Sequence, residues 1–477
     1  MTTNRMDRQS VRVLLCTLAA AALLGGLARP AGAQATSGRD VYQEQIRVRL
    51  DQQLPAAREM GLDAGGWFSF AFFNYDDAGA RKKRTLRQYE LRGWGSVNIQ
   101  GVHRFYVRGL LGYDDWNSGD NPREFHGDQY SGLEIERAWY QFDLGRLLQN
   151  QTGQEPLLNF RVKAGRAFAE MGTALVLSMP LDMVQFDVGV GAWEFMALLG
   201  KTVEHTRNLD DSDAVASHQD RCLWGMQLTY TGFDRHRPFV YFLSNEDDTD
   251  PRPRDPFQSY SYSSRYVGVG SEGALLLPDL RYQAEVVGEF GKTYSGGVTA
   301  GRDNICAMAA DVLLEYLFRL PTRPKITYEY LWGSGDQDRL LSATTTVLGN
   351  RRGTNDNAFN AFGFRDLGLA FAPRLSNLHV YSLGASFFPL EQHKLFERME
   401  VGTKVFFYHK STAPGPISDS TGPSNARWIG WEWDVYCNWR LTSDLSWTIR
   451  YGAFMPSGAF SDDSCRQFLL TAVILSF

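Results

Sequence analysis

Few residue patterns in this chain could support catalysis. The segment GEFGKT at 288–293 ends like a phosphate-binding loop, but its glycines are three residues apart instead of five. Neither G-x-S-x-G nor H-E-x-x-H occurs, and the eight histidines stand singly. The acidic group Glu246, Asp247, Asp248 and Asp250 offers oxygen ligands for Ca²⁺, but it lacks EF-hand spacing, so a solvated loop is the simpler interpretation. We therefore predict no catalytic residue, no metal site and no cofactor.

The remaining charged residues are of the kind that recognises charged solutes. By the strand alternation described below, the cations expected to face the interior of a closed sheet are Arg92, Arg104, Arg108, Arg137, Arg161, Lys163, Arg166, Arg281, Lys404 and Arg450. The acids expected there are Glu134, Glu136, Glu285, Glu289, Asp311, Glu315, Glu329, Glu432 and Asp434. Cations gather in the N-terminal half and acids in the C-terminal half, and such a separation orients polar solutes and filters ions. Pairing of opposite charges along a hydrated wall is the alternative for many of them.

Period-2 alternation positions these side chains. In RWIGWEWDVYCNWR, residues 427–440, Ile429, Trp431 and Trp433 fall on one face of a strand and Glu432 and Asp434 on the other. Similar segments at 280–290 and 89–100 alternate in the same way. These segments run about 10 to 15 residues, longer than strands of soluble proteins and suited to a tilted strand that crosses a bilayer. The fold class predicted is an all-β transmembrane antiparallel barrel of the outer-membrane type.

The connections and the C-terminus agree with a closed barrel of about 18 strands. Short turns, such as those around 232–237 and 320–324, alternate with long polar loops, such as those beginning at 245 and 410, as periplasmic turns and extracellular loops do. The chain ends on the apolar strip FLLTAVILSF, residues 468–477. We expect this strip to pair with the first strand and to turn one apolar face to lipid, because a closed barrel leaves no free edge.

The N-terminus is typical of a secretory signal peptide. Residues 1–33 carry Arg5, Arg8 and Arg12, an apolar run from Val13 to Leu27 and the small-residue site at 31–33, so cleavage is expected before Gln34. Its removal would change the formal net charge from −5 to −8. Residues 34–66 are expected to form a periplasmic segment, with a short helix or mobile stretch at 39–62, and residues 67–477 the barrel. No basic tract for nucleic acid is present.

Two stretches resemble the alginate export family. In NFRVKAGRAFAEMGTALVLSMPLDMVQFDVGVGAW, the pairs Gly165-Arg166 and Phe186-Asp187 match the family's Gly-Arg strand end and its Phe-Asp-Gly return, with Val188 where glycine is common. YEYLWGSGDQD (328–338), NAFNAFGFRDLG and LSNLHVYSLGASFFP (375–389) follow in the family's order. The resemblance implies an 18-stranded outer-membrane barrel that passes a uronate polysaccharide through an arginine-lined pore. It carries Arg166 and Asp187 over as lumen contacts, with Arg161 and Lys163 expected on the same strand face.

The sequence therefore predicts an outer-membrane channel that passes a saccharide, such as an alginate-like uronate polymer or its fragments, by passive diffusion. The expected partners are outer-membrane lipid and the saccharide, with no nucleic acid; a periplasmic secretion partner is left open. The loop 334–377 carries Arg351, Arg352, Phe359, Phe362 and Arg365, and two placements stay open for it: folded inward or over the pore mouth, or standing as an ordinary extracellular loop. Three alternatives remain: a general porin for small ions and nutrients, an outer-membrane enzyme, and a soluble secreted β-protein. Acids on the inner face would oppose a polyanion.

Overall fold

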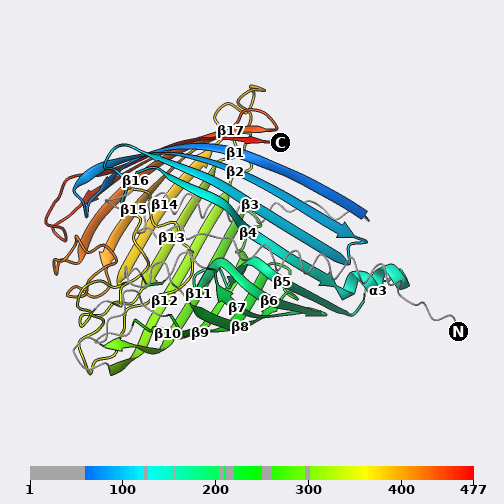
Figure 1. Cartoon of the computed structure of the whole chain (residues 1–477), viewed down its shortest axis with the longest axis horizontal. Helices are drawn as coiled ribbons and strands as arrows, with labels where there is room; N and C mark the ends of the chain where they lie inside the picture. Colours follow the sequence, from blue (N-terminus) through cyan, green and yellow to red (C-terminus); the bar gives the residue numbers. More distant parts are fainter. Residues whose placement is uncertain are drawn as a thin grey trace.

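The computed structural model describes residues 60–122, 127–154, 156–203, 209–210, 220–249, 260–295, 301–346 and 348–477. These residues form one closed antiparallel sheet of 18 strands (Figure 1). In chain order the strands are β1 (Met60–Asp77), β2 (Lys82–Ile99), β3 (His103–Trp116), β4 (Gln129–Asp143), β5 (Leu158–Met171), β6 (Leu177–Val190), β7 (Trp193–Thr202), β8 (Arg221–Tyr230), β9 (His236–Asp247), β10 (Ser263–Ala274), β11 (Leu280–Ser295), β12 (Gly301–Leu317), β13 (Lys325–Gly333), β14 (Leu378–Phe387), β15 (Met399–Lys410), β16 (Trp428–Arg440), β17 (Leu445–Pro456) and β18 (Arg466–Ser476). The predicted fold class and strand number are confirmed.

The first and last strands close the barrel. β1 pairs with β18 in continuous register from Trp67 opposite Ser476 to Tyr75 opposite Phe468. The backbones of Gly66 and Phe477 exchange two hydrogen bonds, each of 2.9 Å. The apolar C-terminus is thus paired along both edges, as the sequence predicted. β1 begins at Met60 rather than at residue 67, so its first residues come from the segment expected to precede the barrel.

The two faces of the sheet differ in chemistry as the alternation indicated. On β16, Trp431 and Trp433 are 37% and 45% exposed on the outer face, whereas Glu432 and Asp434 are buried on the inner face. Because lipid offers no hydrogen bonds, an apolar outer face and fully paired backbone suit a bilayer. Free cysteines at Cys222, Cys306, Cys437 and Cys465 form no disulfide.

Connections separate by length between the two ends of the barrel. Turns at 100–102, 191–192, 231–235 and 441–444 lie at the end that also holds both termini of the sheet, which in outer-membrane barrels faces the periplasm. Loops at 334–377 and 411–427 lie at the other end. Several connections depart from the expected alternation. The β1–β2 turn at 78–81 and the β5–β6 turn at 172–176 are short at the extracellular end, whereas at the periplasmic end the β4–β5 connection contains a helix and the β14–β15 connection at 388–398 is long.

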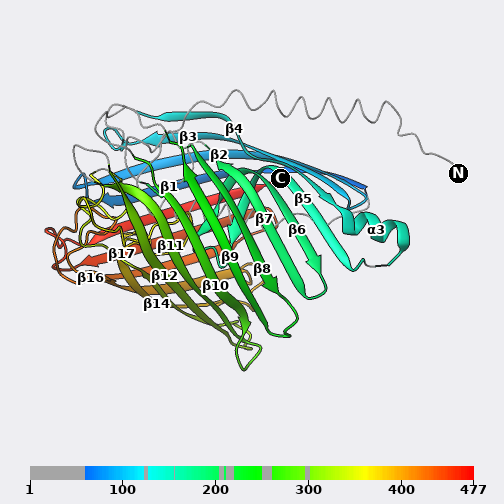
Figure 2. The ribbon, with the colours of Figure 1, turned by 90° about the horizontal axis from the view of Figure 1, so that it is seen from below.

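That helix, α3 (Leu144–Thr152), has clear local causes although it was not predicted. The Asp143 carboxylate accepts a hydrogen bond from the backbone N–H of Arg146, which caps the N-terminus. Gly153 ends the helix at φ +71° and donates its N–H to the Gln149 carbonyl. Figures 1 and 2 place α3 at one end of the barrel. Within the described residues, no helix is long and apolar enough to span a membrane.

The β5–β6 hairpin leaves the wall and enters the barrel. β4 pairs with β5 only from Ala138 to Asp143, opposite Arg161 to Arg166. Beyond this point residues 167–180, here called the inserted hairpin, extend inward, and the N–H of Thr173 donates to Glu285 on the inner face of β11 at 2.6 Å. Gly165, with φ +122°, lies where the hairpin departs, and a Cβ there would collide with the Ala138 carbonyl. This position therefore requires glycine.

A cross-link tests the closure. Ala71 on β1 and Ala472 on β18 are register partners on the inner face, and alternation from the hydrogen-bonded Gly66–Phe477 pair makes theirs a non-hydrogen-bonded pair, whose side chains are close. In a background with the four native barrel cysteines replaced by serine, Ala71→Cys with Ala472→Cys should form a disulfide under mild oxidation, seen as a mobility shift after denaturation. Ala71→Cys with Leu470→Cys, two residues out of register, is the control, and equal cross-linking of both pairs would contradict the register.

Candidate functional site

Six of the cations on the inner faces of β2 to β5 form what we call the basic wall: Arg92, Arg104, Arg108, Arg137, Arg161 and Lys163. Register places Asp143 opposite Arg161, Gln141 opposite Lys163 and Trp139 opposite Gly165, so both β5 cations share a face with Trp139. The Lys163 ammonium lies 5.3 Å from the Trp139 ring centroid. The register thus puts these six side chains on one face of the sheet, and their contact with a solute stays a prediction.

Part of the basic wall is a closed network. Arg92 and Arg108 both donate to Glu136, at 3.0 and 2.9 Å, and Arg92 also pairs with Glu90 at 2.8 Å. The guanidinium groups of Arg92 and Arg108 lie 5.9 and 5.8 Å from the centroid of the Trp67 ring. These two arginines are buried, and their charge is balanced by carboxylates. They support the wall more than they offer charge to a solute.

Three other cations keep their charge available. Among the described residues, Arg104, Arg161 and Arg281 have no hydrogen bond or ion pair to another side chain. Each lies near the periplasmic end of its strand: Arg104 one residue into β3, Arg281 one residue into β11 and Arg161 three residues into β5. The periplasmic half of the lumen therefore carries positive charge that the protein itself does not neutralise.

Arg166 does not share the face of Arg161 and Lys163, and that expectation is wrong. Residues an odd number apart on a strand point to opposite sides, and β5 keeps continuous register with β6 through this region. Arg166 donates to both oxygens of Asp182, at 2.8 and 2.9 Å, and to the Ile135 carbonyl at 2.9 Å. It thus braces β4 against β6 where β5 leaves the wall. A solute contact by Arg166 stays a prediction.

Asp187 does lie on the inner side. It is the register partner of Arg161 and accepts a hydrogen bond of 2.8 Å from the side-chain amide of Gln185. The cations Arg161 and Lys163 of β5 thus lie beside the Asp187 carboxylate of β6 on the inner face. Charge and hydrogen bonding are sufficient for such a set to contact a polar solute.

The loop 334–377, here called the inserted loop, folds into the barrel. The Glu432 carboxylate on β16 accepts hydrogen bonds from three successive backbone N–H groups, those of Leu369, Ala370 and Phe371, at 2.5, 2.6 and 2.9 Å. Glu289 on β11 accepts the N–H of Asn360 at 2.9 Å. The loop thus folds inward and does not stand as an ordinary extracellular loop, and it contacts β11 and β16, which are five strands apart in the sheet. Its acceptors Glu289 and Glu432, together with Asp311 on β12, are here called the acidic wall.

Arg365, expected as a pore contact, joins the inserted loop to the inserted hairpin. Its guanidinium pairs with Asp311 on β12 at 2.6 Å and also donates to the Thr173 hydroxyl. Burial alone would lower the pKa of Arg365, but nearby carboxylates, led by Asp311, raise it above the ordinary value. The charge is thus held inside the structure, and the guanidinium is mostly enclosed.

A second buried pair fixes the base of the inserted loop. The Asp356 backbone bridges β12, with its N–H donating to Asn304 at 2.7 Å and its carbonyl accepting from Cys306 at 2.8 Å. Its carboxylate lies 3.2 Å from the Arg339 guanidinium. Burial raises the pKa of Asp356, and the Arg339 charge opposes that rise. The loop is therefore bonded to the wall through backbone and side chains.

Sequence reasoning missed the inward tyrosines. Tyr262 donates to Glu289 at 2.8 Å, Tyr266 to the Asn360 carbonyl at 2.6 Å, and Tyr408 to the Leu367 carbonyl at 2.9 Å. Tyr266 and Tyr408 occupy inward positions beside the exposed outward side chains of Val267 and Phe407. A tyrosine on the polar side of an alternating strand was the available signal.

The acidic group near 247 is not arranged for a metal. The Asp247 carboxylate pairs with Arg221 at 2.9 Å and accepts the Tyr262 N–H at 2.7 Å, while Asp250 lies outside the described residues. In the described ranges, no cluster of three or more His, Cys, Asp or Glu side chains could hold a metal ion.

Comparison with known proteins decides the family. The family model described as alginate export matches residues 181–467, more than half of the chain. The chain belongs to the alginate export family. The matched range runs from within β6 to the start of β18 and includes the whole inserted loop. As a member of this family with a closed 18-strand barrel, the protein is an outer-membrane channel. No curated protein sequence matches it.

Solved structures confirm the fold. Acinetobacter baumannii OccAB3 is similar with a TM-score of 0.54 at 9% identity, covering 87% of this chain and 99% of that one. Pseudomonas aeruginosa OccK5 (OpdH) gives 0.53 at 12% identity over 87% and 98% of the two chains. Pseudomonas aeruginosa OccK2 (OpdF), solved in complex with glucuronate, gives 0.50 at 10% identity over 87% and 98%. At such identities the likeness shows the barrel architecture alone.

The Glu432 contacts generate a stability prediction for the inserted loop. Glu432→Ala leaves three buried N–H groups without an acceptor, which should lower the free energy of local opening by about 3 kcal/mol and speed amide exchange at 369–371 roughly a hundredfold. Hydrogen-exchange mass spectrometry of the protein in detergent measures this. Glu400→Ala, on the inner face but hydrogen-bonded only within the wall at 3.4 and 3.5 Å, is the matched control. Unchanged exchange in Glu432→Ala would contradict the anchoring role.

Proposed function

We propose that this channel passes an anionic saccharide, an alginate-like uronate polymer or its fragments, by passive diffusion along the basic wall. The observation that carries the proposal is the uneven use of charge in the lumen. Arg104 and Arg161 have no partner among the described residues, whereas the facing acids are bonded to the inserted segments. A uronate carboxylate would find free guanidinium groups, whose planar fork binds both of its oxygens.

The acids of the C-terminal half therefore oppose a polyanion less than the sequence suggested. Glu285 and Glu289 accept backbone N–H groups of the inserted hairpin and the inserted loop, at 2.6 and 2.9 Å. Glu329 pairs with Lys404 at 3.2 Å. The Lys404 charge offsets that of Glu329, and a carboxylate that already accepts backbone N–H groups has fewer lone pairs left for a solute.

Two comparisons support the substrate class. The family's described activity is alginate export, and alginate is a uronate polymer. OccK2, one of the similar barrels, was solved with glucuronate, a single uronate. The second candidate is a general porin for small ions and nutrients, which the mixed charge of the lumen favours. The channel needs no bond-breaking chemistry in either case, because selectivity arises from hydrogen bonds and charge at a site weak enough to release the solute.

Block of single channels tests the proposal. In a planar bilayer, uronate oligomers should interrupt the ion current of the refolded protein at concentrations at which neutral oligosaccharides of the same length do not. Arg104→Gln combined with Arg161→Gln should weaken the uronate block about tenfold or more, because charge-assisted hydrogen bonds are lost.

Lys201→Gln is the matched control, since Lys201 lies on the outer face, pairs with Asp220 at 3.0 Å and carries the same charge. It should leave the block unchanged. Equal block by neutral and uronate oligomers would support the general porin and contradict the proposal.

A further inference from the structure

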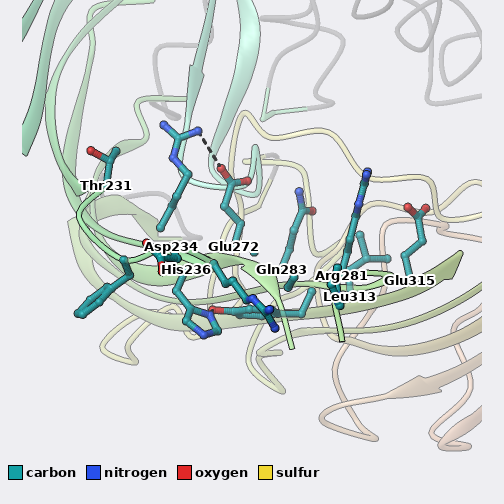
Figure 3. Close-up of a pocket in the computed structure, with 15 residues that line it drawn as sticks. Thr231, Asp234, His236, Glu272, Arg281, Gln283, Leu313 and Glu315 are labelled. Atoms are coloured by element: carbon teal, nitrogen blue, oxygen red, sulfur yellow. Dashed lines mark hydrogen bonds and ion pairs between the residues drawn. The ribbon is translucent and has the colours of Figure 1, made fainter. Parts of the chain in front are cut away.

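A recess of about 770 Å³ lies in the wall at the periplasmic end of β9 to β12. It is bounded by the turns at 231–235 and 275–279 and by inward side chains of the adjoining strands. Figure 3 shows Glu272, Gln283, Arg281 and Glu315 extending from neighbouring strands to the same side of the sheet, while His236 extends to the other. Its volume is within the range of small-molecule sites.

Register explains why these side chains converge. Glu272 on β10 lies opposite Gln283 on β11, and Arg281 on β11 lies opposite Glu315 on β12. Because directly opposed residues share a face, these four side chains form two adjacent rows on the inner surface. They lie below the inserted segments, since Glu285, which holds the inserted hairpin, is two positions further along β11.

The charges of the recess are unequally satisfied. Glu315 forms an ion pair of 3.4 Å with Lys325. Glu272 has a longer contact of 3.8 Å with Arg237, because Arg237 also pairs with Glu194 at 3.1 Å. Arg281 has no hydrogen bond or ion pair among the described residues, although Glu315 is its register partner. The unpaired Arg281 guanidinium is thus close to the Gln283 amide and to the Glu272 and Glu315 carboxylates. Each of these carboxylates has a cation on the neighbouring strand away from Arg281: Arg237 for Glu272 and Lys325 for Glu315.

We infer that this recess is a binding site for one uronate unit at the periplasmic access to the channel. The Arg281 guanidinium takes the sugar carboxylate, the Gln283 amide donates to and accepts from hydroxyls, and Glu272 and Glu315 accept hydroxyl hydrogen bonds. This inference rests on the proposed function, and it adds where the polymer is first bound and by which groups.

The arrangement suits a uronate better than a neutral or a strongly anionic solute. A neutral sugar would leave the Arg281 charge without a counterion, whereas a dense anion such as phosphate would lie close to Glu272 and Glu315 and be repelled. A pyranose bearing one carboxylate and several hydroxyls matches one free cation surrounded by acceptors and an amide. The site also lies on the side from which a polymer destined for export arrives.

The test compares Arg281→Gln with the wild-type full-length mature protein. Binding of a uronate trimer to the protein in detergent, measured by titration calorimetry, and block of single channels by the same trimer are both recorded. Arg281→Gln should weaken trimer binding about tenfold, with open-channel conductance in KCl close to the wild-type value. Arg440→Gln is the matched control: Arg440 lies at the same end of the barrel, on β16, is bonded to the Ser443 carbonyl at 2.9 Å and is outside the recess. It should bind the trimer as the wild type does.

The outcomes separate this inference from the proposed function. Wild-type binding of uronate with an unchanged Arg281→Gln variant would overturn the recess as a site while leaving the uronate channel in place. A wild-type protein that neither binds nor is blocked by the trimer would overturn both. Equal loss of binding in Arg281→Gln and Arg440→Gln would reduce the effect to general charge at this end of the barrel and would also overturn the site.

Discussion

A peptide group inside a bilayer has no water to bond with, and this constraint governs the whole molecule. It requires β18 to pair with β1, so that the apolar strip ending at Phe477 completes the wall through its bonds to Gly66. It also sends polar side chains to the inner face, because the outer one contacts hydrocarbon. The charged lumen is thus a consequence of closure, and its chemistry depends on which inward charges find partners.

The inward acids and the inward cations differ in whether the protein itself supplies their partners. Glu432 and Glu289 receive backbone N–H groups of the inserted loop, and Asp311 receives Arg365, so the acidic wall holds the protein's own segments. Removing such an acceptor would leave buried donors unpaired, which makes these contacts costly to break. Arg104 and Arg161 on the other wall have no partner among the described residues. A protein with a formal charge of −5 can therefore present a basic path to a solute.

Much of this could be predicted from residue periodicity, and the rest could not for physical reasons. Alternation identified the strands and the inward position of Arg281 or Glu432, because side-chain direction on a strand is a local property. Grouping Arg166 with Arg161 is an error that alternation itself corrects, because residues five apart on a strand point to opposite faces. Alternation gives no signal for the inserted hairpin that leaves the wall at Gly165. The inward fold of the loop 334–377 depends on contacts with distant strands, such as Asn360 with Glu289, which no single segment encodes. The signal peptide and the helix expected at 39–62 lie outside the described residues.

The central claim is that the lumen's effective charge is set by its unpaired cations and not by its acids, which are bonded to other parts of the protein. The reversal potential of the refolded mature protein in a planar bilayer, under a tenfold KCl gradient at neutral pH, tests it most directly. The account predicts a potential of the sign that indicates preference for chloride. A preference for potassium would contradict it, since it would mean that the carboxylates bonded to the inserted loop and hairpin still dominate the field along the path.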